Sequence, residues 1–292
     1  MPAFETLRKR IKTVSNTEKI TKAMKMIAAV KLRKLQQQAD NSRAYANNIE
    51  EIVREITAKI DTTLHPLMRK PTEINKTLIV LMSSDRGLCG GYNSNVNRLA
   101  LQALKESKDN NTELEFITIG KNGRDMLRRS GAKINLDLSG SSGNPNYSEV
   151  RDISSVCING FADGEYDEVS LIYNRFMSVL SQKPVEEILL PLSRIVVEQS
   201  EAEILDPKML IYEPSLQEIL MSLLPRMIES RIYHALLESA ASEHAARMTA
   251  MDSATNNAKD MIQTLTLVMN KARQSTITKE LMDIVNGAEA MR

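Results

Sequence analysis

The sequence predicts an α/β fold with long helices: an antiparallel coiled coil of the N- and C-terminal segments plus an inserted Rossmann-like α/β domain with a parallel sheet. Apolar residues recur every 3.5 residues on average along 216–272, and the same spacing recurs along 7–60. Between these segments, short apolar runs alternate with helical stretches and turn residues. We expect terminal helices over 1–60 and 206–292, a linker over 61–76 and the α/β domain over 77–205.

The N-terminal segment is predicted to form one long helix because it contains neither Gly nor Pro from Ala3 to Lys59. Its apolar seam is strong over 28–60 and weak over 15–25, where Glu18, Thr21 and Lys25 occupy seam positions. Two interpretations of the weak part stay open: a locally solvated face, or a face that contacts another protein.

The middle of the chain has the pattern of a parallel sheet with helical crossovers. Pro66 and Pro71 favour a linker, and the continuous apolar run that follows them is typical of a strand buried on both faces. The expected strands are 77–83, 115–119, 132–138, 168–175 and 185–191. The expected helices are 93–105, 123–129 and 148–161.

The C-terminal segment carries the longer seam. Four polar residues interrupt it: Ser230, His234, His244 and Thr255. Between Leu216 and Gly287 the only helix breaker is Pro225, which either kinks the helix or starts it. Two seam-bearing helices with a domain between them most simply pair antiparallel, since each buries the apolar face of the other.

Composition indicates a soluble protein with an uneven charge. The 292 residues are 42% hydrophobic and 26% charged, and no run approaches the length of a membrane span. Residues 1–38 carry a net charge of +8, which leaves −7 for the remainder of a chain whose total is +1. Such a basic arm favours an acidic partner. The two cysteines, Cys89 and Cys157, indicate a reducing compartment with both thiols packed in the fold.

The sequence shows no catalytic constellation and no metal or cofactor motif. The Gly-rich stretch 83–93 follows the first expected strand, but its glycines fit neither G-x-G-x-x-G nor a P-loop. A tight strand-to-helix turn is therefore favoured over a phosphate site, and Asp85–Arg86 is expected to form a local ion pair or a partner contact. Three histidines, at 65, 234 and 244, lack ligand spacing.

Four segments carry a more specific pattern. They are KITKAMKMIAAVKLRK at 19–34, SSDRGLCGG at 83–91, SEHAARMTAM at 242–251 and a C-terminal signature. That signature consists of Ile277, Thr278, Glu280, Asp283, Gly287, Ala288 and Ala290. In this order, and over essentially the whole chain, the segments resemble the gamma subunit of F-type ATP synthases.

The resemblance implies a non-catalytic central rotor shaft that needs no cofactor, because nucleotide chemistry in this family belongs to the beta subunit. The shaft would couple proton-driven rotation of the membrane ring to conformational cycling of the beta sites, and would regulate ATPase activity and proton flow. Its implied partners are three alpha and three beta subunits, the epsilon subunit and the c-subunit ring. Its implied location is peripheral, on the cytoplasmic face of a bacterial plasma membrane, with membrane contact only through partners.

The resemblance also implies contact residues, position by position. Contacts with the alpha/beta ring are implied for Met24, Lys25, Arg273, Gln274, Thr278, Ile284 and Val285. Contacts with the c ring and epsilon are implied for Tyr212 and Glu213. Family members often carry Glu at the position of Lys25, so the charge at that contact differs here.

Two other classes of function compete with this interpretation. A nucleic-acid-binding coiled coil would use the basic arm, but the only aromatic residue of the arm is Phe4, with Tyr45 just beyond it. An enzyme with a doubly wound domain would require a phosphate motif or an acid/base pair, and the sequence has neither.

Overall fold

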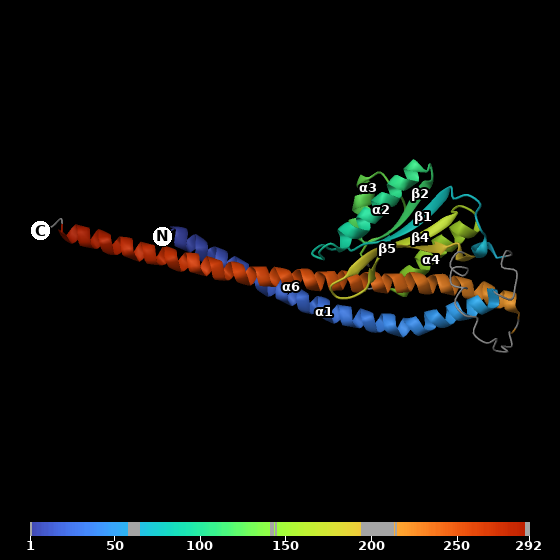
Figure 1. The fold of residues 1–292 in the computed structure, drawn as a ribbon, viewed down its shortest axis with the longest axis horizontal. Helices are drawn as coiled ribbons and strands as arrows, with labels where there is room; N and C mark the ends of the chain where they lie inside the picture. The colour runs from blue at the N-terminus through green and yellow to red at the C-terminus, as the bar shows by residue number, and fades with distance from the viewer. Residues whose placement is uncertain are drawn as a thin grey trace. The chain divides into compact units, whose positions relative to one another are not determined.

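The computed structural model describes residues 2–57, 65–140, 143, 145–193, 213 and 215–289 (Figure 1). The helices are α1 (Pro2–Thr57), the 3₁₀ turn η2 (Pro66–Met68), α2 (Tyr92–Asp109), α3 (Lys121–Arg129), α4 (Tyr147–Ala162) and α6 (Leu216–Glu289). The strands are β1 (Lys76–Met82), β2 (Glu113–Ile119), β3 (Lys133–Leu138), β4 (Glu168–Phe176) and β5 (Gln182–Leu190). The predicted combination of long terminal helices and an inserted α/β domain is confirmed.

The five strands form one sheet in the order β3-β2-β1-β4-β5. The first four strands are parallel, as predicted, but β5 runs antiparallel to β4. The reason is the short connection, because β4 ends at Phe176 and β5 begins at Gln182. A parallel crossover needs about a dozen residues or more, whereas a few residues suffice for a hairpin.

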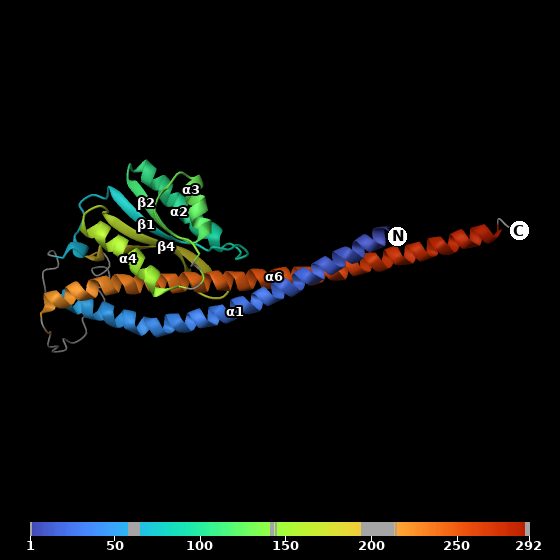
Figure 2. The same ribbon diagram turned by 180° about the vertical axis from the view of Figure 1, so that it is seen from behind.

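Both faces of the sheet are covered, which explains why β1 is an unbroken apolar run. Ile79 and Leu81 pack with residues of α2 and α3. Leu78, Val80 and Met82 belong to a second cluster that includes residues of α4, α1 and α6. Figures 1 and 2 show α2 and α3 on one face of the sheet and α4 on the other.

The chain divides into two compact units, and α1 and α6 each contribute to both. One unit is Ala29–Arg247 and the other combines Met1–Ala28 with Met248–Arg292. Residues 58–64 and 194–212 lie outside the described residues. The linker over 61–76 and the domain boundary at 205 therefore remain predictions.

Within the unit Ala29–Arg247, α1 and α6 pair antiparallel through the predicted seam. Leu32 and Leu35 of α1 pack in a cluster with Leu237 and Ala241 of α6. Nearer the start of α6, Arg231 bonds to Glu50 at 3.0 Å. Later residues of α1 thus meet earlier residues of α6, as an antiparallel pair requires.

Two details of α6 settle questions that the sequence left open. Pro225 lies inside α6, which begins nine residues earlier at Leu216, so it does not start the helix. His234, a polar break in the seam, lies with its Nε2 3.2 Å from the Glu238 carboxylate one turn later. The polar break is thereby given a partner on its own helix.

A close backbone approach joins the ends of β1 and β2. Gly120 has φ +88°, and a Cβ there would lie 2.2 Å from the Ser83 carbonyl oxygen. Only glycine fits this position, because a side chain would clash and the positive φ is unfavourable for other residues. The contact fixes the start of the Gly-rich segment that follows β1.

Candidate functional site: a protein interaction surface

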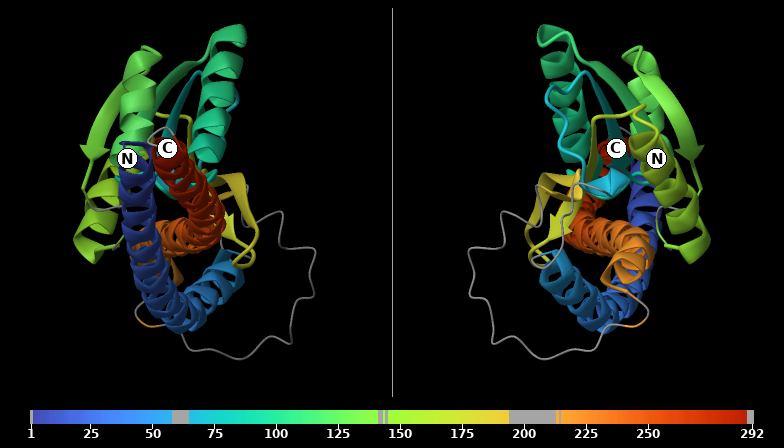
Figure 3. Two further views of the ribbon diagram at one scale, coloured as in Figure 1. Left: turned by 90° about the vertical axis from the view of Figure 1, so that its left-hand side faces the viewer. Right: turned by 90° about the vertical axis from the view of Figure 1, so that its right-hand side faces the viewer.

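The unit formed by the chain ends is an antiparallel pair of helices held by a narrow seam. Figures 1 and 3 show the N-terminal half of α1 beside the C-terminal half of α6. Buried residues on α6 recur at Met251, Thr255 and Ala258, and Thr21 and Ala28 are buried on α1. These spacings of three, four and seven residues are those of a coiled-coil seam, and they follow the predicted positions.

Within the weak part of the α1 seam, Thr21 and Lys25 both reach residues of α6. Thr21 is 7% exposed, and its hydroxyl accepts a hydrogen bond of 2.8 Å from the hydroxyl of Thr255. The two polar residues at opposed seam positions thus satisfy each other. Neither open interpretation of this segment holds for Thr21, and the sequence could not show its partner because it lies 234 residues away.

Lys25 also reaches the opposite helix, and Met24 lies half-buried beside it. The Lys25 Nζ is 2.6 Å from an Asp252 carboxylate oxygen, and the two side chains are 40% and 47% exposed. An ion pair this exposed stabilises a fold by about 1 kcal/mol or less. The pair leaves Lys25 accessible to a partner.

An apolar surface on α1, which the sequence analysis did not single out, lies outside the seam. Ile20, Met26 and Ile27 are 60%, 61% and 58% exposed. Ile20 and Ile27 are seven residues apart and therefore share one face of the helix. The signal was present in the sequence, because the stretch around Lys25 has more large apolar residues than one seam requires.

The last turns of α6 extend beyond their partner helix. With Thr21 opposite Thr255, the antiparallel register places Phe4 opposite Ala272. Figure 1 accordingly shows α6 running on past the N-terminus of α1. Arg273, Gln274 and Thr278 are exposed there, and the Thr278 hydroxyl donates to the Gln274 carbonyl oxygen at 2.9 Å.

The end of α6 presents an uncovered apolar stripe. Ile284 and Val285 are 68% and 52% exposed, and Ile277 and Leu281 are 45% and 57% exposed. Their spacing of three, four and seven residues places them on one helix face. A contiguous exposed apolar face on a soluble protein marks an interaction surface.

Of the two residues implied for contact with the c ring and epsilon, only Glu213 is among the described residues. Tyr212 lies outside the described residues, while Glu213 is described and exposed. Glu213 belongs to the unit Ala29–Arg247, whereas Met24, Lys25 and the α6 tip belong to the other unit.

The Gly-rich segment after β1 is a structural turn, as favoured from the sequence. The Asp85 carboxylate accepts from the backbone N–H of Lys121 at 3.1 Å and of Gly140 at 2.8 Å. The carbonyl oxygens of Arg86 and Gly87 each lie 3.4 Å from a guanidinium nitrogen of Arg247 on α6. The segment is thus held by its own chain.

Arg247 belongs to a buried polar cluster that the sequence analysis missed. Its guanidinium donates to the Glu243 carboxylate at 2.7 Å, and both residues are less than a tenth exposed. Burial raises the pKa of Glu243, against the opposing attraction of Arg247. Burial also lowers the pKa of His244 to about 4, so that this side chain is neutral at pH 7. The i,i+4 spacing of Glu243 and Arg247 was the available signal.

No described residues form a cluster of three or more His, Cys, Asp or Glu side chains that could hold a metal ion. Both cysteines are free and buried, and burial raises the pKa of the Cys157 thiol to about 12. Among the described helices, none combines the length and the apolar character that a bilayer crossing demands.

Comparison with known proteins identifies the family. The sequence model of a family described as ATP synthase matches residues 3–291. The chain is 43% identical over 293 residues to the ATP synthase gamma chain of Pelotomaculum thermopropionicum, and the alignment covers all of both chains. It belongs to the ATP synthase gamma-chain family. It is also 44% identical over 292 residues to the gamma chain of Geotalea daltonii, again over the full length of both.

Solved structures agree with this assignment. A chain from the central stalk and c ring of the Tetrahymena thermophila mitochondrial ATP synthase is 29% identical, with a TM-score of 0.58, over 80% of this chain and 99% of that chain. A chain from the Euglena gracilis mitochondrial ATP synthase has a TM-score of 0.65 over 99% of this chain and 95% of that one; at 19% identity it supports the fold alone. These gamma-chain comparisons give no support to the nucleic-acid-binding alternative.

Proposed function

We propose that the protein is the central rotor shaft of an F-type ATP synthase, coupling rotation of a membrane ring to the cycling of catalytic sites in the surrounding subunits. The observation that carries this proposal is full-length membership of the gamma-chain family. The paired terminal helices support it, because two helices joined along a seam resist bending and twisting better than one. The uncovered apolar stripe at the end of α6 supports it too, since that stripe needs an apolar socket.

The proposed role is non-catalytic and needs no cofactor. The one segment with a phosphate-binding character in the sequence is the Gly-rich turn, and the carbonyl oxygens of Arg86 and Gly87 there face Arg247 of the same chain. A P-loop binds phosphate through backbone N–H groups. This turn instead uses backbone carbonyl oxygens, which bond to Arg247 of α6. ATP chemistry is therefore assigned to the beta subunits of the complex.

The proposed partners are three alpha and three beta subunits, the epsilon subunit and the c-subunit ring. The exposed side chains support a ring contact along the paired helices and the α6 tip. The residues proposed for it are Met24, Lys25, Arg273, Gln274, Thr278, Ile284 and Val285. Tyr212 and Glu213 are proposed to contact the c ring and epsilon.

The protein is proposed to be peripheral, on the cytoplasmic face of a bacterial inner membrane, and to reach the membrane only through its partners. The proposed division into functional parts is a helix over 1–60, a linker over 61–76, the α/β domain over 77–205 and a helix over 206–292. The full-length bacterial relatives support the location, and the long terminal helices support the division.

Co-expression with alpha and beta subunits tests this function. The chain is expected to co-purify with both and to be required for their sustained ATP hydrolysis. Failure to co-purify, or full hydrolysis by alpha and beta without the chain, would contradict the proposal. The nucleic-acid alternative predicts binding to DNA or RNA that weakens steeply as salt rises.

Single alanine substitutions at Gln274 or Thr278 are expected to slow ATP turnover by less than about fivefold, below ~1 kcal/mol. A shaft that must turn through several angles is best served by many weak contacts, because one strong contact would trap one angle. Steady-state ATPase assays on the reconstituted complex measure the effect. Collapse of activity after either substitution would refute the distributed-contact idea.

A further inference from the structure

Buried polar side chains join α6 to the α/β domain, and the role proposed above does not account for them. Ser239 and Ser242 of α6 are 4% and 0% exposed, and Tyr92 and Asn174 of the domain are 3% and 0% exposed. All four belong to the unit Ala29–Arg247. Figures 1 and 2 show the orange part of α6 running beside the domain.

Three hydrogen bonds link α6, the start of α2 and β4 into one network. The hydroxyls of Tyr92 and Ser239 are 2.7 Å apart and share a hydrogen bond. The Asn174 Nδ2 donates to the Tyr92 carbonyl oxygen at 3.0 Å, and the Ser242 hydroxyl donates to the Asn174 carbonyl oxygen at 2.8 Å. Burial raises the pKa of Tyr92, so its hydroxyl keeps its proton. The network thus holds α6 at two positions that lie three residues apart on one helix face.

The pairing of β4 with β5 helps to explain why Asn174 bonds to α6. Asn174 lies opposite Pro184 of β5, and proline has no backbone N–H to donate. The Ser242 hydroxyl supplies a donor to the Asn174 carbonyl oxygen. The Asn174 Oδ1 is buried without a hydrogen bond to any described residue, which costs stability. Apolar side chains of similar shape would avoid that cost, so the network does more than stabilise the fold.

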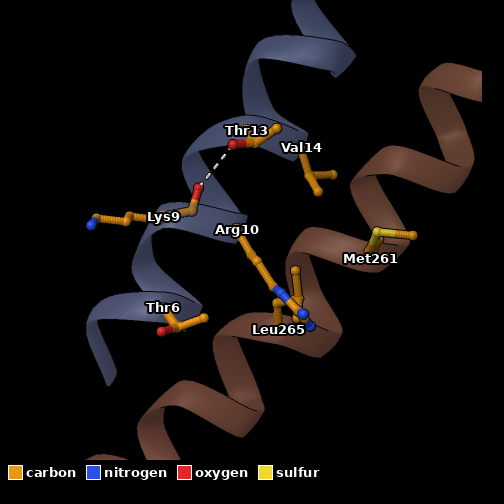
Figure 4. A pocket seen from close by; sticks show the side chains of 7 residues that line it. All are labelled: Thr6, Lys9, Arg10, Thr13, Val14, Met261 and Leu265. Atoms are coloured by element: carbon orange, nitrogen blue, oxygen red, sulfur yellow. Dashed lines mark hydrogen bonds between the residues drawn. The ribbon is translucent and has the colours of Figure 1, made fainter. Parts of the chain in front are cut away.

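Apolar contacts of α6 before and after this network have no comparable direction. Leu224 and Ile228 pack in the apolar cluster that includes residues of the sheet. Nearer the chain ends, Figure 4 shows Val14 of α1 with Met261 and Leu265 of α6, and the hydrogen bond drawn there stays within α1. Burial of apolar surface stabilises such contacts, but it depends little on orientation.

A change in the angle of α6 about its own axis would break the polar network. Successive residues of a helix are about 100° apart around its axis, so a shift of one residue would turn both serine hydroxyls away from the domain. The Tyr92 hydroxyl and the Asn174 carbonyl oxygen would then be buried without their partners, which is unfavourable. Polar residues inside apolar interfaces fix the register of coiled coils for the same reason.

We propose that Tyr92, Asn174, Ser239 and Ser242 form an interlock that fixes the angle of α6 against the α/β domain, so that torque passes between the two without slip. The four are positioning residues, and the inference rests on the proposed rotor function. A stiff joint requires an energy that rises steeply with small displacements. Hydrogen bonds meet this requirement, because they weaken steeply as their angle departs from linearity.

Single-molecule rotation of the assembled complex tests the interlock. A bead is attached to Asp109→Cys at the exposed end of α2, since both native cysteines are buried and escape labelling. The complex with alpha and beta subunits is fixed to a surface, and the angular variance of the bead is measured during pauses of ATP-driven rotation.

Tyr92→Phe with Ser239→Ala is expected to raise the angular variance about twofold, because the domain then loses a directional bond to α6. ATP turnover is expected to stay within about twofold of the parent, since removing both partners of a buried hydrogen bond is nearly neutral for folding. Ser242→Ala breaks the other link to α6 and is expected to raise the variance as well.

Tyr166→Phe with Ser154→Ala is the matched control. It also removes one phenol hydroxyl and one serine hydroxyl from buried residues, but their hydrogen bonds lie within the α/β domain. It is expected to leave the variance unchanged. An unchanged variance in both interlock variants, or an equal rise in the control, would overturn the inference. A parent complex whose bead does not rotate with ATP would instead contradict the proposed function.

Discussion

At the scale of single residues, the most strongly perturbed carboxylate of the sheet is Glu115. It is 1% exposed, yet it is surrounded by donors. The Lys76 amine is 2.8 Å from one carboxylate oxygen, and the Tyr166 hydroxyl donates to the other at 2.8 Å. Burial alone would raise its pKa, but hydrogen bonds from Lys133, Lys76 and Tyr166 together outweigh burial and lower the pKa to about 2.

Replacing this carboxylate is expected to change how stability depends on pH. Because the pKa of Glu115 is lower in the folded state, its contribution is present above the unfolded pKa of about 4.5 and is lost as pH falls toward 2. We expect Glu115→Gln to lower the free energy of unfolding at pH 7 by on the order of 2–3 kcal/mol. Urea titrations at several pH values measure this, and the difference from the parent should shrink between pH 4.5 and 2.

Glu113→Gln is the matched control, because Glu113 also bonds to Lys133 but its side chain is 55% exposed. Its effect is expected to be about 1 kcal/mol or less. A difference between Glu115→Gln and the parent that stays constant from pH 7 to pH 2 would show that the loss is one of packing and not of charge.

At the scale of elements, α6 contains a proline where a helix normally has none. Pro225 removes one backbone N–H, and so leaves the carbonyl of Met221 without its i→i+4 donor. Met221 is 58% exposed, which allows water to bond to that carbonyl. The first turns of α6 are therefore expected to be the weakest part of the helix.

Pro225→Ala is expected to stabilise the first turns of α6 by about 1–3 kcal/mol. Amide hydrogen exchange over residues 216–224 should slow by roughly tenfold or more as a result. Ser222→Ala serves as the control, since it raises helix propensity in the same turns by only about 0.5 kcal/mol. Equal protection in both variants would mean that Pro225 imposes no local weakness.

The elements also show what the sequence can predict. The 3.5-residue spacing predicted both helices of the coil, because periodic burial of apolar side chains is a local property. The partner of Thr21 and the contacts of Arg247 with the turn after β1 could not be predicted, because they join residues 234 and about 160 positions apart. The orientation of β5 was missed for a different reason: an apolar run does not reveal strand direction.

The candidate interaction surface was also predictable only in part, because exposure depends on contacts between residues far apart in the sequence. The α6 tip was identified through the family resemblance, which implied contacts for Ile284 and Val285. The exposed Ile20 and Ile27 were hidden, since an apolar residue outside a seam looks the same in the sequence as one that another element covers. Only the arrangement of neighbours distinguishes the two.

At the scale of the whole molecule, exposed apolar side chains are unevenly divided between the two units. Among the residues that the structure describes, more than half of the exposed large apolar side chains belong to the unit that contains the chain ends, although that unit holds only about a quarter of the chain. Without its partner subunits, the chain should therefore not remain a monodisperse monomer, because exposed apolar surface drives association.

The isolated chain is therefore expected to self-associate and to bind a hydrophobic dye, and both properties should be lost on assembly with alpha and beta subunits. Leu281→Lys with Val285→Lys should reduce self-association, because each buried aliphatic side chain contributes about 1.5–3 kcal/mol. Sedimentation velocity measures the mass, and dye fluorescence measures the exposed surface. The control pair, Leu101→Lys with Leu180→Lys, removes exposed apolar residues from the other unit. If the control pair reduces self-association as much as the tip pair, the α6 tip is not the surface that awaits a partner.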